Sequence, residues 1–298
     1  MNLTIDRVSK TYDNGVKALD ELSLEIPTGM FGLLGPNGAG KSSLMRTIAT
    51  LQPADSGSIT FNGIDVFNNP LDLKKNLGYL PQEFGVYENE SAQSLLDYFA
   101  LLKGIISKKS RRTQVERVLE LTNLLDTRKK KVSNFSGGMK RRFGIAQILL
   151  TNPELIIVDE PTAGLDLTER TRFLNVLRSI GTDHTVIFST HIVGDVKELC
   201  QRLAIVNEGK VILEDSTQGV IQKLNGKIWS ACIPPDQLSL FKDKYVVLST
   251  SFQNDQELTI RVFSEDKPED SRINWLIVSP DLSDVYFHQL ENKPEIHV

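Results

Sequence analysis

The segment from Gly35 to Ser42 carries residue types that bind phosphate groups. It matches the pattern G-x-x-x-x-G-K-[ST] and lies between an apolar run and a helix-like repeat of apolar residues. Its glycines let successive backbone N–H groups face one concavity at the positive end of a helix. Lys41 would add charge for the β and γ phosphates, and the Ser42 hydroxyl an oxygen for Mg²⁺. By ordinary composition, a chance match in such a chain is about a one-in-a-hundred event. The predicted nucleotide-binding residues here are Gly35, Pro36, Asn37, Gly38, Ala39, Gly40, Lys41, Ser42 and Ser43.

Two adjacent carboxylates follow a second apolar run. Leu155–Val158 predicts a strand buried on both faces, and Asp159 and Glu160 come directly after it. Asp159 would hold Mg²⁺ through water, and Glu160 would orient and polarise the water that attacks a phosphate. A solvated turn at the end of a strand is the commoner interpretation of an isolated Asp-Glu pair. A phosphate loop on a sister strand favours the catalytic interpretation.

The pentapeptide Phe135–Met139 opens a predicted helix ahead of the Asp159 strand. Its sequence, Phe-Ser-Gly-Gly-Met, resembles the Leu-Ser-Gly-Gly-Gln signature of the ATP-binding-cassette (ABC) transporter ATPases. The resemblance covers about Leu3–Leu224. Phe135 and Met139 depart from the signature, and Leu167 stands where proline is common. These departures bear more on the subfamily than on the chemistry.

Further residues occur in the order typical of that family. Tyr12 stands where an aromatic ring stacks on adenine, Gln82 resembles the glutamine of the Q-loop, Asp166 that of the D-loop and His191 the switch histidine. Each alone would be an ordinary core or surface residue, but their joint order favours a site. The resemblance implies a catalytic set of Glu160, His191 and Gln82. The magnesium ligands it implies are Ser42, Gln82 and Asp159.

The resemblance also implies a shared site. Ser136, Gly137, Gly138 and Met139 would act on the ATP of a partner chain in a head-to-tail dimer, so that ATP joins the two chains. This chain carries one cassette, so the dimer is expected between chains, as a homodimer or a heterodimer. ATP and Mg²⁺ are the implied cofactors.

The elements that must position these residues alternate along the chain. Strands separated by helices predict an α/β fold with a mostly parallel sheet. The resemblance implies, more specifically, a P-loop ATPase of the ABC nucleotide-binding type with a mixed sheet. The cassette is expected over residues 1–225, with a helical subdomain at about 84–150. Predicted strands are 3–8, 22–26, 30–34, 58–61, 77–80, 155–158, 185–188, 203–206 and 211–213. Three predicted helices are marked by residues at helical spacing: 44, 48 and 51; 95, 99 and 102; and 115, 118, 119 and 122, the last helix behind a possible cap at Ser110. Three further helices are predicted at 145–150, 168–180 and 192–200.

The composition changes near Asn225 and Gly226. Residues 226–298 hold 7 basic and 12 acidic residues, against 27 and 26 before them. Strand-like pieces at 227–233 and 257–263 and a helical end at 282–290 predict a small α+β appendage. The balanced charge argues against a nucleic-acid partner. Basic runs at 108–112, 128–131 and 140–142 are expected to be solvated faces, with phosphate or lipid-headgroup contact as the alternative.

Composition excludes several classes of protein. The chain has 298 residues, 40 % of them hydrophobic, which is ordinary globular usage. The longest charge-free stretch, Ile26–Gly40, holds two prolines and five glycines and is no membrane-spanning helix. The first residues lack a secretory pattern, and Cys200 and Cys232 form no CxxC motif. We expect a cytoplasmic protein, peripheral on the inner face of the cell membrane, whose membrane-spanning permease is a separate chain.

Three roles compete for such an ATPase. A DNA-repair or chromosome-organising ATPase would need a long coiled coil between Lys41 and Asp159, and there is no room for one. A translation factor would normally carry two cassettes or cysteine-rich sites. The transporter subunit is favoured, with a cell-envelope role as a further alternative. The run Gly29–Leu34 and the C-terminal appendage resemble the bacterial multidrug and antibiotic-export branch. The apolar residues Phe84, Val86 and Tyr87 either suit a groove for a permease helix or pack inside the helical subdomain.

Overall fold

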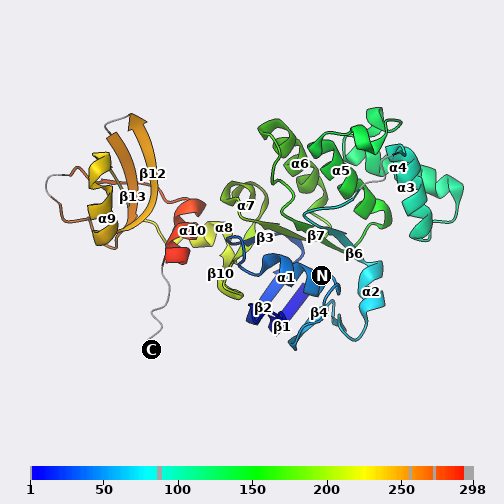
Figure 1. Cartoon of the computed structure of the whole chain (residues 1–298), viewed down its shortest axis with the longest axis horizontal. Helices are drawn as coiled ribbons and strands as arrows, with labels where there is room; N and C mark the ends of the chain where they lie inside the picture. The colour runs from blue at the N-terminus through cyan, green and yellow to red at the C-terminus, as the bar shows by residue number, and fades with distance from the viewer. Residues whose placement is uncertain (1, 86–88, 255–256, 271–272, 292–298) are drawn as a thin grey trace. The chain divides into compact units, whose positions relative to one another are not determined.

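The computed structural model describes residues 2–85, 89–254, 257–270 and 273–291 (Figure 1). The chain divides into two compact units, Met1–Val211 and Ile212–Val298. The sequence-based boundary at residues 225 and 226 stays a prediction. The short helix α8 (Thr217–Gln222) precedes that boundary and falls in the second unit.

An antiparallel sheet begins the first unit. It contains β1 (Asn2–Thr11), β2 (Lys17–Pro27), β4 (Ser56–Phe61) and β5 (Ile64–Asp65), in the order β2-β1-β4-β5. Alternate residues of β1 face a core in which Leu3 and Ile5 are buried, as the two-residue period requires. The strands predicted at 3–8, 22–26 and 58–61 are confirmed.

A six-stranded sheet positions the predicted site. Its order is β10-β9-β3-β8-β7-β6, and β3 is parallel to β8 and β9, as β7 is to β6 and β8. The phosphate loop, Glu160 and His191 therefore follow β3, β7 and β8 at the same edge of the sheet. β7 and β8 are buried throughout, which accounts for their continuous apolar runs. The strands are β3 (Gly29–Leu34), β6 (Leu77–Leu80), β7 (Leu155–Asp159), β8 (Thr185–Thr190), β9 (Arg202–Asn207) and β10 (Lys210–Ser216).

Four helices accompany these sheets. They are α1 (Lys41–Ile48), α2 (Pro70–Lys75), α6 (Leu167–Ile180) and α7 (Val193–Leu199). The apolar spacing predicted a helix that reaches Leu51, but α1 ends at Ile48. Thr50 adopts φ 56°, in the left-handed region, which interrupts a helix. Leu51 is consequently exposed.

A helical segment lies between β6 and β7. It contains α3 (Ala92–Leu102), α4 (Lys108–Leu121) and α5 (Gly137–Ile148). Two details differ from prediction. The cap of α4 is Ser107, whose hydroxyl accepts from the Ser110 amide at 3.4 Å, so Ser110 lies inside the helix. Leu102 is the last residue of α3 and is exposed rather than part of its apolar face.

The second unit has its own sheet, in the order β12-β13-β11-β14, with antiparallel pairing. Its core includes Trp275, whose ring lies 6.0 Å from Phe241 and 5.6 Å from Tyr245, centre to centre. The predicted pieces at 227–233, 257–263 and 282–290 are confirmed as β11, β13 and α10. The elements are β11 (Ile228–Ile233), α9 (Leu238–Lys244), β12 (Val246–Asn254), β13 (Glu257–Phe263), β14 (Leu276–Ile277) and α10 (Leu282–Glu291).

The two cysteines differ in exposure. Cys200 is buried and Cys232 is exposed, and within the described residues neither forms a disulfide. Burial, and after it the charge of Asp195, raises the pKa of the Cys200 thiol. In the part of the chain that the structure describes, no helix has the length and apolar character needed to cross a bilayer.

A candidate nucleotide site at the ends of the parallel strands

The phosphate loop is held against backbone on two sides. Gly40 has φ 104°, and a Cβ there would lie 2.3 Å from the Ala18 carbonyl oxygen. At Gly35 a Cβ would lie 2.2 Å from the Val206 carbonyl oxygen. No side chain fits at either position, so this glycine pattern is a steric requirement of the loop as well as a means of exposing its N–H groups.

A cavity of about 470 Å³ opens beside this loop, within the size range of small-molecule sites. It gathers residues from across the sequence, including most of those predicted. Gly35, Pro36, Asp159, Asp166 and Ser136–Met139 are predicted site residues that do not line it, and Val16 and Ala18 line it without having been predicted. The lining residues are Tyr12, Val16, Ala18, Asn37, Gly38, Ala39, Gly40, Lys41, Ser42, Ser43, Gln82, Glu160 and His191.

Lys41 is buried at the base of the loop. Its Nζ donates to the carbonyl oxygens of Gly35 at 2.7 Å and Pro36 at 3.0 Å. The same atom lies 3.4 Å from Glu160 Oε1. A buried ammonium group requires acceptors and an opposite charge, and here it has both. The positive charge is thereby fixed in the wall of the cavity, beside the glycine loop.

Glu160 connects two segments of the site. Its Oε2 lies 2.8 Å from His191 Nδ1, and its backbone N–H donates to the Ser189 carbonyl oxygen at 3.0 Å. Its φ is 45°, in the left-handed region that non-glycine residues rarely adopt. Because this carboxylate touches both Lys41 and His191, three predicted site residues meet at one point.

Asp159 has the properties of a magnesium ligand. Its side chain is buried, and Oδ1 has no hydrogen-bond partner among the described residues. Burial raises the pKa of the neighbouring Tyr79, and the charge of Asp159 raises it further. Mg²⁺ in nucleotide sites takes one or two protein oxygens and completes its shell with phosphates and water, which one carboxylate and the Ser42 hydroxyl can supply. The donor set therefore fits the ion.

A buried carboxylate that the sequence did not reveal contacts the segment that follows Glu160. Asp195 of α7 accepts from Thr162 Oγ1 at 2.5 Å and from Arg170 Nε at 2.6 Å. Thr162 lies two residues after Glu160, and Asp195 lies four after His191. The Asp195 contacts thus join the segment after β7 to the helix after β8. An acid in a short helix carries no sequence signal of burial.

The basic run Lys140–Arg142 is not a solvated face. Arg141 Nη1 donates to the Gln82 backbone oxygen at 2.8 Å, and burial lowers its pKa while the Glu160 charge opposes this. Arg142 is buried and pairs with Glu169 at 3.2 Å. The prediction of a solvated face was wrong here because two of the three residues turn toward acceptors inside the unit. Arg141 also ties α5 to the backbone of Gln82.

The signature residues surround the start of α5. Ser136 is exposed, and its hydroxyl caps the helix by accepting from the Met139 amide at 3.2 Å. Asp166 caps α6 in the same way, accepting from the Glu169 amide at 2.8 Å. The Glu169 side chain in turn lies against Gly138. The signature and Asp166 are therefore in contact through one residue.

Gly138→Ala should destabilise the fold, whereas Gly137→Ala should not. A Cβ at Gly138 would lie 2.7 Å from Glu169 Cβ, but one at Gly137 would meet only Leu165 Cδ2 at 3.9 Å. Overpacking of this kind costs about 1–3 kcal/mol. Thermal unfolding of the two neighbouring variants measures the difference. Equal melting temperatures would contradict the contact between Gly138 and Glu169.

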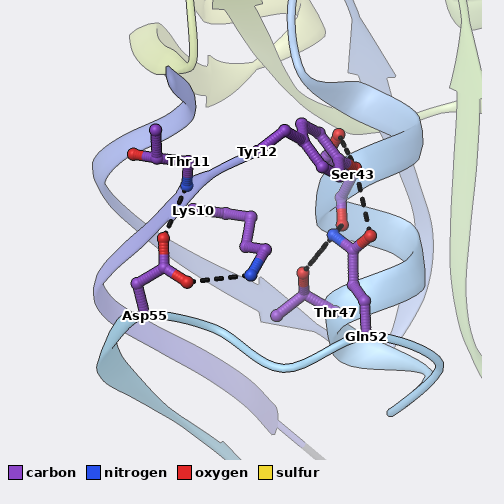
Figure 2. A network of polar contacts seen from close by, with 7 residues as sticks. All are labelled: Lys10, Thr11, Tyr12, Ser43, Thr47, Gln52 and Asp55. Atoms are coloured by element: carbon purple, nitrogen blue, oxygen red, sulfur yellow. Dashed lines mark hydrogen bonds and ion pairs between the residues drawn. The ribbon is translucent and has the colours of Figure 1, made fainter. Parts of the chain in front are cut away.

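Tyr12 lines the cavity and is tied to α1. Its hydroxyl lies 3.0 Å from Ser43 Oγ and donates to Gln52 Oε1, also at 3.0 Å (Figure 2). Gln52 has no place in the sequence motifs, and its polar partners become visible only in the fold.

Comparisons with known proteins show to which family the chain belongs. A family model described as "ABC transporter" matches residues 19–163. The linearmycin resistance ATP-binding protein LnrL of Bacillus subtilis (strain 168) is 35 % identical over 227 residues, covering 75 % of this chain and 72 % of that protein. The chain belongs to the ABC transporter ATP-binding proteins. As a member of this family it is an ABC transporter ATPase.

Two other similarities cover a comparable share of this ABC transporter ATPase. The daunorubicin resistance ATP-binding protein DrrA3 of Streptomyces coeruleorubidus is 34 % identical over 226 residues, covering 75 % of this chain and 71 % of that protein. The dimeric post-hydrolysis structure of the ATP-binding cassette MJ0796, bound to ADP and Pi, superposes with a TM-score of 0.65 at 24 % identity. That match covers 72 % of this chain and 98 % of the cassette, and confirms the predicted ABC nucleotide-binding fold.

Proposed function

We propose that this ABC ATPase binds ATP with Mg²⁺, dimerises on it, and uses its hydrolysis to drive a separate membrane-spanning exporter subunit. The observation that carries the proposal is the meeting of Lys41, Glu160 and His191 in one cavity beside the glycine loop. These groups supply a phosphate-binding charge, a general base and an orienting partner for that base.

Each residue has a defined task in this proposal. The loop N–H groups and Lys41 hold the phosphates, and the Tyr12 ring stacks on adenine. Glu160 orients the attacking water and His191 holds the Glu160 carboxylate, while Gln82 takes part in catalysis and contacts the metal. Ser42, Gln82 and Asp159 would hold Mg²⁺, Asp159 through water. The ion supplies charge neutralisation of the phosphates when bound.

The composite site is supported by where the signature lies. Ser136 and Gly137 are exposed at the start of α5, and neither lines the cavity of their own chain. An exposed helix N-terminus with a donor hydroxyl suits an anion brought by another molecule. In a two-fold dimer, Ser136–Met139 of one chain would cover the ATP held by the partner, and Asp166 would lie at the same interface.

Export is favoured by the relatives. LnrL and DrrA3 are named for antibiotic resistance, which fits removal of a toxic compound from the cell. Docking to a permease would place this subunit in the cytoplasm, at the inner face of the membrane. This role involves no nucleic-acid partner. Val86 and Tyr87, two of the three predicted docking residues, lie outside the described residues. Phe84 lies close to Gly144 of α5, which favours packing inside the helical segment for that residue.

Co-expression tests the proposed role. The chain should co-purify with the product of a neighbouring reading frame that encodes about six membrane spans. In proteoliposomes its ATPase rate should then depend on a transported compound. Association with ribosomes, and no binding to that membrane protein, would instead support the translation-factor alternative.

A chain ending at Asn225 should still bind ATP and Mg²⁺. All predicted site residues lie in the first unit, Met1–Val211, and Trp275 belongs to the core of the second. We expect the truncated and full-length chains to have dissociation constants for ATP within about two-fold, because no group that contacts ATP is removed. Nucleotide titration measures this. A folded truncated chain that binds no ATP would show that the predicted boundary cuts the catalytic unit, and aggregation would indicate that the appendage covers apolar surface.

A further inference from the structure

Gln52, in the loop after α1, is hydrogen-bonded to the hydroxyl of Tyr12. Gln52 Oε1 accepts the Tyr12 hydroxyl proton at 3.0 Å (Figure 2). A phenol has one proton, so once it is given to Gln52 the second contact, from Ser43 Oγ at 3.0 Å, must be donated by the serine. The Tyr12 hydroxyl is therefore engaged both as a donor and as an acceptor.

Gln52 is itself fixed. Its Nε2 donates to the Ser43 carbonyl oxygen at 3.0 Å and to Thr47 Oγ1 at 2.9 Å, while the Thr47 hydroxyl donates to the same carbonyl at 2.8 Å. Both amide hydrogens and the amide oxygen of Gln52 thus have partners. A side-chain amide satisfied at each end has one orientation, and it holds Tyr12 to the first turns of α1.

The backbone that leads into Tyr12 is also held. Asp55 accepts from Lys10 Nζ at 2.8 Å and from the Thr11 amide at 2.6 Å. The Lys10 hydrogen bond, and after it the Thr11 amide, lowers the pKa of Asp55, so the carboxylate is ionised at neutral pH. Asp55 therefore holds the backbone before Tyr12, and Gln52 holds the Tyr12 hydroxyl.

We propose that Gln52 is a positioning residue for nucleotide binding, which sets the Tyr12 ring at the base end of the cavity through its hydroxyl. The inference rests on the proposed role of Tyr12 as the surface on which adenine stacks. Stacking on an aromatic ring is favourable only when the ring is held at the right place, and ordering it beforehand removes that cost from binding. Gln52 contacts one residue of the predicted phosphate-binding set, Ser43, at its backbone carbonyl oxygen. A carbonyl oxygen is an acceptor and does not bind a phosphate, so the effect of Gln52 should fall on the base end of the cavity.

A comparison of ATP with inorganic triphosphate tests this. In Gln52→Leu, the dissociation constant for ATP with Mg²⁺ should rise about three- to ten-fold, the cost of ordering one side chain. That for triphosphate, which has no base, should stay within about two-fold. Gln114→Leu is the matched control, because the Gln114 amide holds the Leu149 and Leu150 carbonyl oxygens in the helical segment, away from the cavity. It should change neither constant.

Two Tyr12 variants separate the possible results. Tyr12→Phe keeps the ring and loses the tether, so it should match Gln52→Leu, and the double variant should be no worse than either alone. An unchanged ATP constant in Gln52→Leu, or equal weakening of ATP and triphosphate, would overturn the inference. If Tyr12→Ala also leaves ATP binding unchanged, the stacking role in the proposed function fails. If Tyr12→Ala weakens ATP alone and Gln52→Leu does not, only the positioning role fails. Should Gln52→Leu not fold, Tyr12→Phe gives the same answer.

Discussion

Glu160→Gln should lower the steady-state rate of ATP hydrolysis by at least about 100-fold, the usual contribution of a general base. Glutamine has the same shape and can still contact His191 and Lys41, so the cavity keeps its form. It cannot take a proton from water at neutral pH. ATP should therefore bind without turning over, and chains should accumulate as an ATP-bound dimer. Phosphate release and size-exclusion chromatography with ATP measure the two effects.

The matched control is Glu154→Gln, the same substitution at the residue that immediately precedes the first residue of β7. Glu154 accepts from Asn62 near the surface, away from the cavity. Its hydrolysis rate should stay within about two-fold of the unaltered chain, as for surface changes generally. Hydrolysis by Glu160→Gln at the unaltered rate would remove Glu160 from the base role.

Lys41→Ala and Ser136→Arg should each abolish hydrolysis, and a mixture of the two should recover it. In a mixed dimer, one site combines the intact Lys41 of one chain with the intact Ser136 of the other. With random pairing, half of the dimers carry one such site of two, which predicts about a quarter of the unaltered activity. A titration of one variant into the other measures the recovery.

A second mixture shows whether recovery comes from a shared site. Lys41→Ala with Glu160→Gln places both lesions on the phosphate-loop side, so no mixed dimer has a complete site and activity should stay absent. Ser136→Arg also loses the α5 cap, at a cost of about 1 kcal/mol, so its folding is checked by thermal unfolding. Demonstrated mixed dimers without any activity in the first mixture would contradict the composite site.

The strands that carry the site were predictable because both of their faces are buried. Continuous apolar runs as short as Leu155–Val158, bounded by polar residues and turns, are typical of strands at the centre of a parallel sheet. The glycine loop was also predictable from sequence. Gly35 and Gly40, where a Cβ would clash with the Val206 and Ala18 carbonyl oxygens, are the two glycines that the pattern requires. These signals are local in sequence, and their spacing carries the order of the site along the chain.

The supporting contacts were not predictable, because their partners are distant in sequence. Asp195 reads as an ordinary acid of a short helix, yet it is fully buried between Thr162 and Arg170. Gln52 reads as a polar loop residue. Strand β12 was not predicted for another reason: most of it is exposed, so its outer half lacks the apolar alternation that marks a half-buried strand. Ser107 and Ser110 are equally good caps in sequence, and only the fold selects between them.

The difference in exposure between the two cysteines has a practical use. A maleimide reacts with a thiolate, and burial opposes formation of one at Cys200. Cys232 is exposed on β11 of the second unit and is not one of the predicted site residues. The unaltered chain therefore offers one reactive position for a fluorophore or spin label. A dye attached there would report how the second unit responds to nucleotide without any engineered cysteine in the cassette.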